Sequence, residues 1–191
     1  MNLGIKDEAF VRGKVPMTKE EIRILTLVKA QIAPDAVIYD VGAGTGSLSI
    51  EAARLAPAGH VYAIEKNPEA IGLIAENAKR FGTENITVVE GAAPDALEGL
   101  PALDVALIGG SGRKLSDILD IIGERLRPAG RIVANAITMQ TAAACLDYFH
   151  AHADRYTYEA IQVQINRLER VGSYDMAKAL NPIYIITAQR K

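Results

Sequence analysis

A glycine-rich loop gives the clearest chemical signal in the sequence. Residues 40–46, Asp-Val-Gly-Ala-Gly-Thr-Gly, follow an apolar run and precede a segment of helical character, which is the context that a nucleotide-binding loop requires. Glycine tolerates positive φ angles and lets a ligand approach the backbone closely. A dinucleotide fingerprint counted from Gly42 would have its third glycine at position 47, but Ser47 stands there and the third glycine is Gly46. The GxGxG spacing therefore favours S-adenosyl-L-methionine (SAM) over a dinucleotide.

An acidic residue at the end of the next apolar run strengthens this interpretation. Glu65 stands 19 residues after Gly46. A carboxylate there can accept hydrogen bonds from both hydroxyls of a ribose. Taken alone, Glu65 could instead be a solvated charge at a strand end. Because the loop and Glu65 follow successive predicted strands, together they predict a SAM site.

Two more loops have small residues where a ligand could approach the backbone. Residues 90–94 read Glu-Gly-Ala-Ala-Pro, and residues 108–112 read Ile-Gly-Gly-Ser-Gly. The first could close over an adenine, although an ordinary turn explains it equally well. The second is unusually rich in glycine for a bare turn, so we expect it to lie beside the transferred group.

Apolar runs alternate with helical patterns along most of the chain, which predicts the elements that position these loops. This alternation is typical of a parallel sheet covered by helices on both faces. The last two predicted strands have no helix-length pattern between them, so we expect an antiparallel end to the sheet. The fold class is therefore a Rossmann-like α/β fold of three layers, α/β/α, with ligands at the carboxyl ends of the strands. The predicted strands are 37–41, 60–65, 86–90, 103–108, 131–136, 156–166 and 182–189, and the predicted helices are 47–56, 67–80, 95–98, 114–126 and 140–152.

The sequence before the first strand predicts an extended segment, residues 1–17, followed by a helix. Thr18 and Glu21 have the spacing of a capping box, with Thr18 as the N-cap. Pro34 ends this helix, whose apolar stripe is Ile22, Leu25, Val28 and Ile32.

Length and composition limit the classes of protein. The 191 residues, 49% hydrophobic and 23% charged, fit a single domain over 1–191: an N-terminal extension and helix (1–33), a cofactor-binding core (35–140) and a C-terminal strand pair (155–191). No apolar run is long enough to span a membrane, and no secretory signal is visible. The single cysteine, Cys145, fits a cytoplasmic protein without an internal disulfide. A net charge of −2 and 5% aromatic residues argue against nucleic acid as a partner, and three histidines with one cysteine predict no metal site.

Residues 40–46, Glu65 and residues 91–93 resemble the class I SAM-dependent methyltransferases over about residues 35–140. More specifically, the chain resembles the cobalt-precorrin-6B C15-methyltransferase (decarboxylating) family of cobalamin biosynthesis. The segments that carry this resemblance are residues 13–23 (GKVPMTKEEIR), 108–112 (IGGSG) and 180–184 (LNPIY).

The resemblance implies a reaction, a cofactor and an assembly. The family methylates C15 of a cobalt-precorrin with SAM, removes carbon dioxide from the ring C acetate, and forms a homo-oligomer, expected to be a tetramer. A separate C5-methyltransferase would be a partner, since fused relatives carry that activity in a preceding domain. Related loops often have an acidic residue at the position of Ala92, so any adenine contact here would come from the backbone. The residues that the resemblance places at the cofactor are Thr18, Gly42, Ala43, Gly44, Thr45, Gly46, Glu65 and Ala93.

The mechanism expected from the sequence needs no triad and no metal, and no catalytic residue is assigned. Methyl transfer is an in-line displacement in which alignment is the main task of the protein. The basic residues before the first strand (Arg12, Lys14, Lys19), after the fourth (Arg113, Lys114) and between the last two (Arg167, Arg170, Lys178) could bind substrate carboxylates. Taken singly, each is read more readily as an ordinary surface charge, and residues 167–178 could form a lid or a subunit contact. Two alternative functions stay open: a tRNA or protein methyltransferase on the same fold, and a SAM-binding subunit without catalysis.

Overall fold

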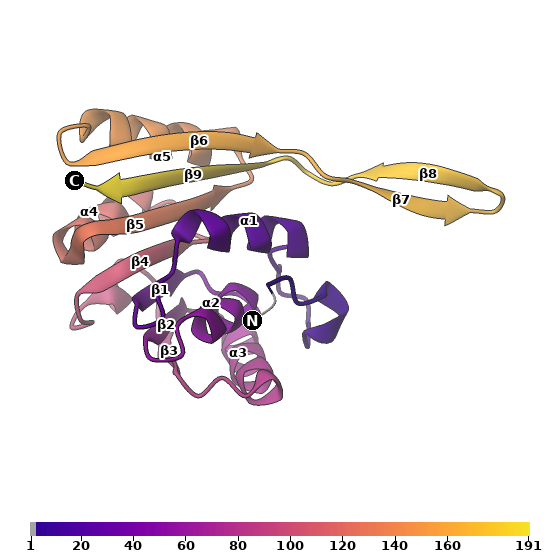
Figure 1. Ribbon diagram of the computed structural model, residues 1–191, viewed down its shortest axis with the longest axis horizontal. Helices are drawn as coiled ribbons and strands as arrows, with labels where there is room; N and C mark the ends of the chain where they lie inside the picture. Colours follow the sequence, from indigo (N-terminus) through magenta and orange to yellow (C-terminus); the bar gives the residue numbers. More distant parts are fainter. Residues whose placement is uncertain (1–2) are drawn as a thin grey trace.

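The computed structural model describes residues 3–191, and its centre is a sheet of seven strands (Figure 1). The strand order is β3-β2-β1-β4-β5-β9-β6. Strands β1 to β5 pair in parallel, and β9 pairs antiparallel with both of its neighbours, β5 and β6. This arrangement confirms the predicted, mostly parallel sheet with an antiparallel C-terminal strand. The strands of this sheet are β1 (Val37–Val41), β2 (His60–Glu65), β3 (Ile86–Glu90), β4 (Leu103–Ile108), β5 (Leu126–Ala136), β6 (Tyr156–Val163) and β9 (Ile183–Arg190).

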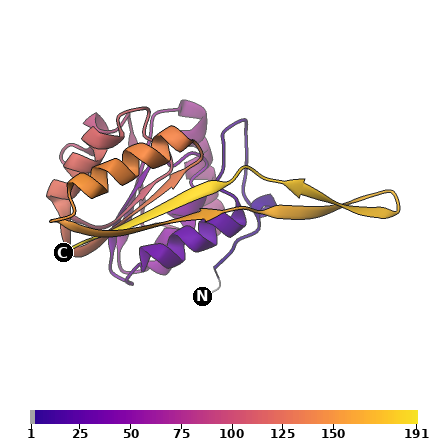
Figure 2. The same ribbon diagram turned by 90° about the horizontal axis from the view of Figure 1, so that it is seen from above.

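Helices cover both faces of the sheet, so the fold has the three predicted layers (Figure 2). One face carries α1 (Glu20–Ala30), α2 (Ser47–Leu55) and α3 (Pro68–Phe81), and the other carries α4 (Leu115–Arg125) and α5 (Met139–Ala151). An apolar core lies on each face of the sheet, and apolar, largely β-branched strand residues contribute to both. Alternate residues of β1 point to opposite faces. Ile38 is buried with the helices α1 and α2, and Tyr39 with α4 and α5.

The register of the strands brings the glycine loops together. Val41, the last residue of β1, is paired with Ile64 of β2 and with Ile108 of β4. The segments that follow these three residues therefore leave the sheet at the same level and lie side by side. Sequence reasoning placed these strand ends correctly to the residue.

The start of α1 differs from the prediction. The N-cap is Lys19 rather than Thr18, and no side chain of the expected capping box is used. Asp7, from a short 3-10 helix (Asp7–Ala9) that was predicted as extended chain, instead accepts a hydrogen bond at 3.0 Å from the Glu20 amide. The predicted stripe is also wrong at Val28, which is 55% exposed, because this edge of α1 faces away from the sheet.

The C-terminal region holds two more strands than expected. Strand β6 ends at Val163, and the chain then forms a two-stranded hairpin, β7 (Asn166–Val171) and β8 (Tyr174–Ala179), before it returns as β9. Figures 1 and 2 show this hairpin projecting far from the body. Its strands have no buried face, so they lack the apolar alternation by which half-buried strands are recognised.

No helix within residues 3–191 has the length and apolar character needed to cross a membrane.

Candidate functional site

A cavity of about 700 Å³ opens at the carboxyl ends of β1, β2 and β4. This volume lies in the range of small-molecule sites, and the position is the one expected for ligands of open α/β sheets. Its lining comes from the segment before α1 (residues 15–19), the loops after four parallel strands (42–44, 65–67, 91–93 and 109–112), strand ends including Asp40, Asn135 and Ile183, and the root of the hairpin (Ile165, Leu180, Asn181).

The glycine loop forms the floor of this cavity. The amides of Gly42 and Ala43 both donate to the carbonyl of Ile64, at 2.9 and 3.1 Å, which bends the chain sharply after β1. Gly42, Gly44 and Gly46 have φ angles of 73°, 57° and 77°, in the left-handed region that glycine adopts without strain. A Cβ atom at Gly42 would lie 2.8 Å from the backbone nitrogen of Gly110. The two glycine loops therefore form a backbone-lined wall that larger residues would fill.

The Glu65 carboxylate shapes the loops on both sides of it. Its Oε2 accepts from the Gly44 amide at 2.9 Å, and its Oε1 accepts from the amides of Lys66 and Asn67 at 2.8 and 2.9 Å. A carboxylate has about four acceptor positions, so Glu65 retains capacity for a ligand. The observed contacts fix its two oxygens at the rim of the cavity.

Asp40 lies beneath the glycine loop as a buried acid. Its Oδ2 accepts from the Ser49 hydroxyl at 2.5 Å. Burial raises the pKa of Asp40 to about 6, with a smaller contribution from the charge of Glu65, although the Ser49 hydrogen bonds act in the opposite direction. Asp40 lines the cavity, and sequence reasoning gave it no role beyond membership of the loop motif.

The segment before α1 covers the cavity. We call residues 11–19 the strap. A Cβ atom at Gly44 would lie 3.0 Å from the Pro16 carbonyl oxygen, so the strap and the glycine loop meet backbone to backbone. Strap residues 15–19 line the cavity, Thr18 among them.

Six of the eight residues predicted at the cofactor line the cavity: Thr18, Gly42, Ala43, Gly44, Glu65 and Ala93. The other two, Thr45 and Gly46, face the protein interior. Thr45 is buried, and a Cβ atom at Gly46 would lie 3.1 Å from the side chain of Ile74 in α3. These two residues support the loop rather than line the space. Sequence reasoning missed the apolar lining from Ile22, Ile165 and Leu180, since these residues belong to elements far from the loops in the sequence.

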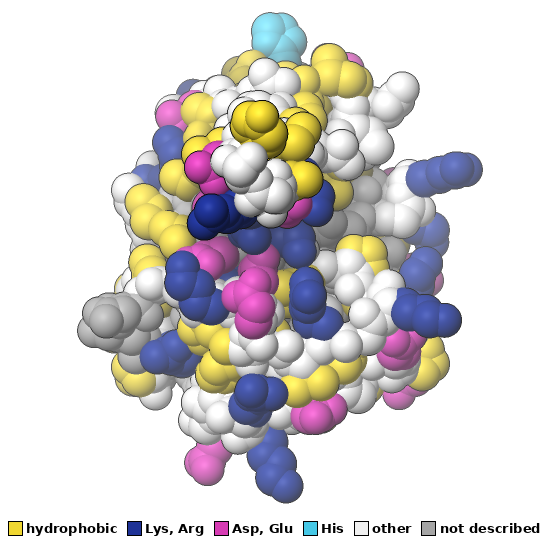
Figure 3. Space-filling model, turned by 90° about the vertical axis from the view of Figure 1, so that its right-hand side faces the viewer, with side chains coloured by type: hydrophobic (Ala, Val, Ile, Leu, Met, Phe, Trp, Pro, Cys, Tyr) yellow, Lys and Arg dark blue, Asp and Glu magenta, His cyan; other side chains and the backbone are white. Residues whose placement is uncertain are grey.

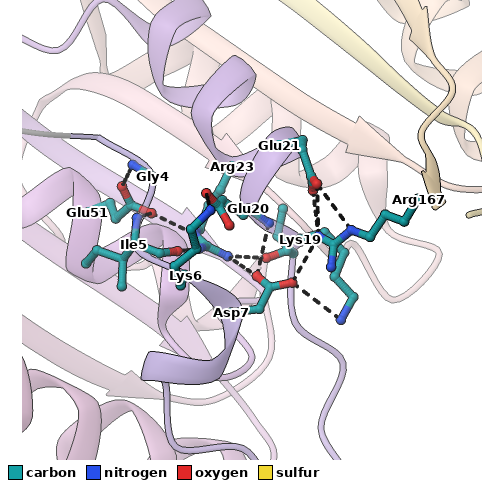
Figure 4. A network of polar contacts seen from close by, with 11 residues as sticks. Gly4, Ile5, Lys6, Asp7, Lys19, Glu20, Glu21, Arg23, Glu51 and Arg167 are labelled. Atoms are coloured by element: carbon teal, nitrogen blue, oxygen red, sulfur yellow. Dashed lines mark hydrogen bonds and ion pairs between the residues drawn. The ribbon is translucent and has the colours of Figure 1, made fainter. Parts of the chain in front are cut away.

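A buried polar network fixes the chain around the C-terminal end of the strap (Figure 4). Arg23 of α1 is fully buried, and its Nε donates to Glu51 at 2.7 Å while its Nη1 donates to Asp7 at 3.1 Å. The same Nη1 donates to the Thr18 carbonyl at 2.5 Å. Thr18 is therefore positioned through its backbone by a residue that does not touch the cavity.

Some of the basic residues singled out in the sequence form ion pairs within the protein, and others line the cavity. Arg167 of the hairpin forms a forked pair with Glu21, with both Nη2 distances at 2.9 Å (Figure 4), and Lys178 pairs with Glu169. Lys19 lines the cavity and lies 3.7 Å from Asp7. Figure 3 views this side of the molecule and shows Lys and Arg side chains around a small acidic group below the hairpin. Arg167 thus anchors the hairpin to α1, and the basic residues among those that line the cavity are Lys19 and Lys66.

Within residues 3–191, no group of three or more His, Cys, Asp or Glu side chains is arranged to hold a metal ion.

Known proteins match the chain over almost its whole length. The family described as "Precorrin methyltransferase domain" matches residues 8–190. A relative from Sulfolobus acidocaldarius, named probable cobalt-precorrin-6B C(15)-methyltransferase (decarboxylating), is 39% identical, with 98% of each chain covered.

Solved structures give the same result. A precorrin-6y C5,15-methyltransferase from Geobacter metallireducens has a TM-score of 0.92 at 40% identity, with 98% of each chain covered. A precorrin 8W decarboxylase from Methanobacterium thermoautotrophicum has a TM-score of 0.90 at 35% identity, covering 96% of this chain and 98% of that one. The chain therefore belongs to the precorrin methyltransferase family, and its cofactor is SAM.

Proposed function

We propose that this chain methylates C15 of a cobalt-precorrin and removes carbon dioxide from the acetate of ring C. The observation that carries the proposal is the cavity itself: one part is walled by glycine backbone and Glu65, and the other by apolar side chains of the C-terminal strands and hairpin root. A nucleoside cofactor suits the first part, and a large conjugated ring suits the second. The relative from Sulfolobus acidocaldarius carries this activity in its name.

The residues around the first part fit SAM. Glu65 lies where its remaining acceptor position could take a hydrogen bond from a ribose hydroxyl, and the small residues 91–93 leave room for an adenine beside their backbone. The glycine loop and Thr18 would surround the amino-acid end of the cofactor. SAM supplies a methyl group made electrophilic by its sulfonium.

The second part of the cavity could align the macrocycle. Ile137, Ile165, Leu180 and Ile183 offer an apolar surface to the ring, and Asn135 and Asn181 add amide groups at its edges. Lys19 is placed to pair with a peripheral carboxylate. The protein's contribution to methyl transfer would be the alignment of donor and acceptor carbon at about 3–3.5 Å.

In the decarboxylation, the conjugated macrocycle of the substrate itself accepts the electron pair that is released. When the bond between the acetate CH₂ and its carboxylate breaks, the electron pair enters the conjugated macrocycle and carbon dioxide leaves. No side chain has to supply a nucleophile, and we assign no catalytic residue.

The proposal also covers the oligomeric state of the enzyme, its domain organisation, its partner enzyme and its localisation. A tetramer would be built through the hairpin, where Val171, Tyr174 and Met176 share one exposed face. The N-terminal helix, the core and strand β9 share an apolar cluster, which supports a single working domain over 1–191. A separate C5-methyltransferase would provide the substrate, and both would be expected in the cytoplasm.

The test is incubation with SAM and a C5-methylated cobalt-precorrin, followed by mass spectrometry. A product heavier by one methyl group and lighter by one carbon dioxide is expected. Methyl gain without loss of carbon dioxide would contradict the decarboxylation. No change, in a protein shown separately to bind SAM, would overturn the choice of substrate.

A further inference from the structure

One buried amide joins the strap to the glycine loop. Asn77 of α3 is fully buried. Its Oδ1 accepts from the Val11 amide at 2.8 Å, and its Nδ2 donates to the Val11 carbonyl at 3.1 Å. The same Nδ2 donates to the carbonyl of Thr45, at 3.0 Å. A single side chain therefore contacts the backbone of both the roof and the floor of the cavity.

These contacts use both amide hydrogens of Asn77 and one position on its oxygen. The two hydrogen bonds between Asn77 and Val11 are reciprocal, like those between paired residues of neighbouring strands, except that one partner here is a side chain. Buried amides without partners are costly, so the position of the strap and that of the loop depend on each other. An aspartate of the same shape would have no hydrogen to donate to either carbonyl.

A second side chain of α3 also contacts the strap, on the outside. Glu69 is exposed, and its Oε1 accepts from the Lys14 amide at 2.9 Å. Gly13 allows this approach, because a Cβ atom there would lie 2.0 Å from the same oxygen. The helix α3 therefore holds the strap at two successive points, Val11 and Lys14, ahead of the residues that line the cavity.

The strap covers the loop directly beyond these points. Pro16 contacts Gly44, and Gly44 is bonded to Glu65 from the other side. Displacing the strap would expose this part of the loop to water and remove Thr18 from the cavity. Roof, loop and ribose-binding carboxylate thus form one connected unit.

We propose that Asn77 is a positioning residue that couples the strap to the glycine loop, so that α3 determines how tightly the cavity closes over its cofactor. The proposal rests on the proposed function only in taking SAM as the occupant. It does not depend on which methyl acceptor is used. Asn77 does not line the cavity, so its effect acts entirely through the backbone of Val11 and Thr45.

The experiment compares two pairs of variants. Asn77→Asp and Asn77→Leu remove the donors from the buried site. Glu69→Leu removes the outer acceptor, while Glu69→Gln retains an oxygen for the Lys14 amide. Glu76→Leu, an exposed carboxylate on the same helix, is the matched control. Each variant is measured for SAM affinity by calorimetry, for tryptic cleavage after Lys14 with and without SAM, and for melting temperature.

We expect SAM affinity to fall about tenfold or more in the Asn77 variants, and several-fold in Glu69→Leu, as the loss of one or two hydrogen bonds implies. Cleavage after Lys14 should become faster in the same order, and SAM should protect the strap less. Glu69→Gln and Glu76→Leu should match the wild type. In turnover, the KM for SAM should rise while kcat at saturating SAM stays within about twofold.

Several results of these measurements would overturn the proposal. SAM affinity that stays at the wild-type value while the strap is cleaved faster would overturn the proposal, and so would unchanged cleavage in every variant. If the Asn77 variants do not fold, the Glu69 pair still tests whether the contact of α3 with the strap controls SAM affinity, since Glu69 lies on the surface. Wild-type SAM affinity in Glu69→Leu would then overturn the proposal. A wild-type chain without SAM affinity would overturn this proposal and the proposed function together, before any variant is compared.

Discussion

Gly44 and Glu65 are joined by a hydrogen bond of 2.9 Å from the Gly44 amide to Oε2 of the carboxylate. The acidic residue that sequence reasoning assigned to the ribose therefore also fixes the conformation of the glycine loop. Its second oxygen accepts two amides of the segment after β2. One carboxylate thus positions the loops after two neighbouring strands.

Replacing Glu65 should weaken SAM binding by two routes. Glu65→Ala would remove the acceptor for the ribose and free three backbone amides, with an expected loss of about 1–3 kcal/mol in binding free energy. Calorimetry measures this loss directly. The control is Glu90→Ala, an exposed carboxylate that ends the next strand in register with Glu65. Equal affinity in Glu65→Ala and the control would contradict the ribose assignment.

Valine at Gly44 should abolish SAM binding and leave a folded chain. The φ angle of 57° is unfavourable for a β-branched residue, and the added Cβ would lie 3.0 Å from the Pro16 carbonyl. The control is Gly82→Val, since Gly82 has a φ of 63° and an added Cβ meets nothing within 4 Å. This control carries the same backbone strain away from the cavity. Circular dichroism checks folding, and wild-type affinity in Gly44→Val would exclude the loop from the SAM site.

The glycine loop shows how much of the site could be predicted from the sequence. The strand ends and the loops that follow them could be predicted, because apolar strands bounded by glycines are local signals. The inward direction of Thr45 and Gly46 could not, since it depends on Ile74 in another helix. The same limit applies to α1, whose first amide is capped by Asp7 from 13 residues earlier rather than by its neighbour Thr18.

The C-terminal region shows a second limit. The strands β6 and β9 could be predicted from the sequence, and the structure buries Tyr156 of β6 and residues 185–188 of β9. The hairpin has six-residue strands without a buried face, so no periodicity marks them. Its position depends on Arg167 and Glu21, which are 146 residues apart in sequence. Long-range ion pairs of this kind leave no local pattern.

Asp40 should make stability depend on pH. Its pKa is raised from 3.8 to about 6 in the folded state, chiefly by burial. Between these values the folded chain binds more protons than the unfolded chain, so the Asp40 contribution to stability decreases as pH rises from about 4 to about 6. The full change corresponds to about 3 kcal/mol.

The measurement for this prediction is urea unfolding of the wild type and Asp40→Asn at several pH values. The difference in unfolding free energy should move in favour of Asp40→Asn as pH rises through this window, and should be constant above about pH 7. The asparagine oxygen can still accept from Ser49. A difference that is independent of pH would show that Asp40 titrates at its ordinary value.

Charges on the hairpin should dissociate the proposed tetramer. Tyr174 and Met176 are 74% and 56% exposed and lie on one face of the hairpin. In Tyr174→Asp/Met176→Asp, two carboxylates would have to be buried in any interface formed by this face, which is unfavourable without partners. Light scattering after size-exclusion chromatography should show a smaller species. The control is Val28→Asp, an exposed apolar position on α1. A wild-type monomer, or a double variant of wild-type size, would exclude the hairpin as the contact.

Removing Arg23 should destabilise the whole chain. Its guanidinium lies between the carboxylates of Asp7 and Glu51, and all three side chains are buried. Arg23→Met would leave Glu51 buried without a cation and Asp7 with only the more distant Lys19 and Arg167, at 3.7 and 3.6 Å. The expected cost is about 3–5 kcal/mol in unfolding free energy. The control is Lys29→Met on the same helix, whose partner Glu159 is exposed, and there the cost should stay below about 1 kcal/mol.

A second substitution tests the cause of this loss. If uncompensated charge is responsible, Glu51→Gln in the Arg23→Met background should recover part of the stability, because glutamine can still accept from the Gly4 amide that bonds to Glu51. In the wild-type background Glu51→Gln should instead destabilise, since it removes the shorter of the two ion pairs of Arg23. If Glu51→Gln is equally harmful in both backgrounds, the role of Arg23 is packing against Phe10, whose ring centroid lies 4.8 Å from the guanidinium, rather than charge compensation.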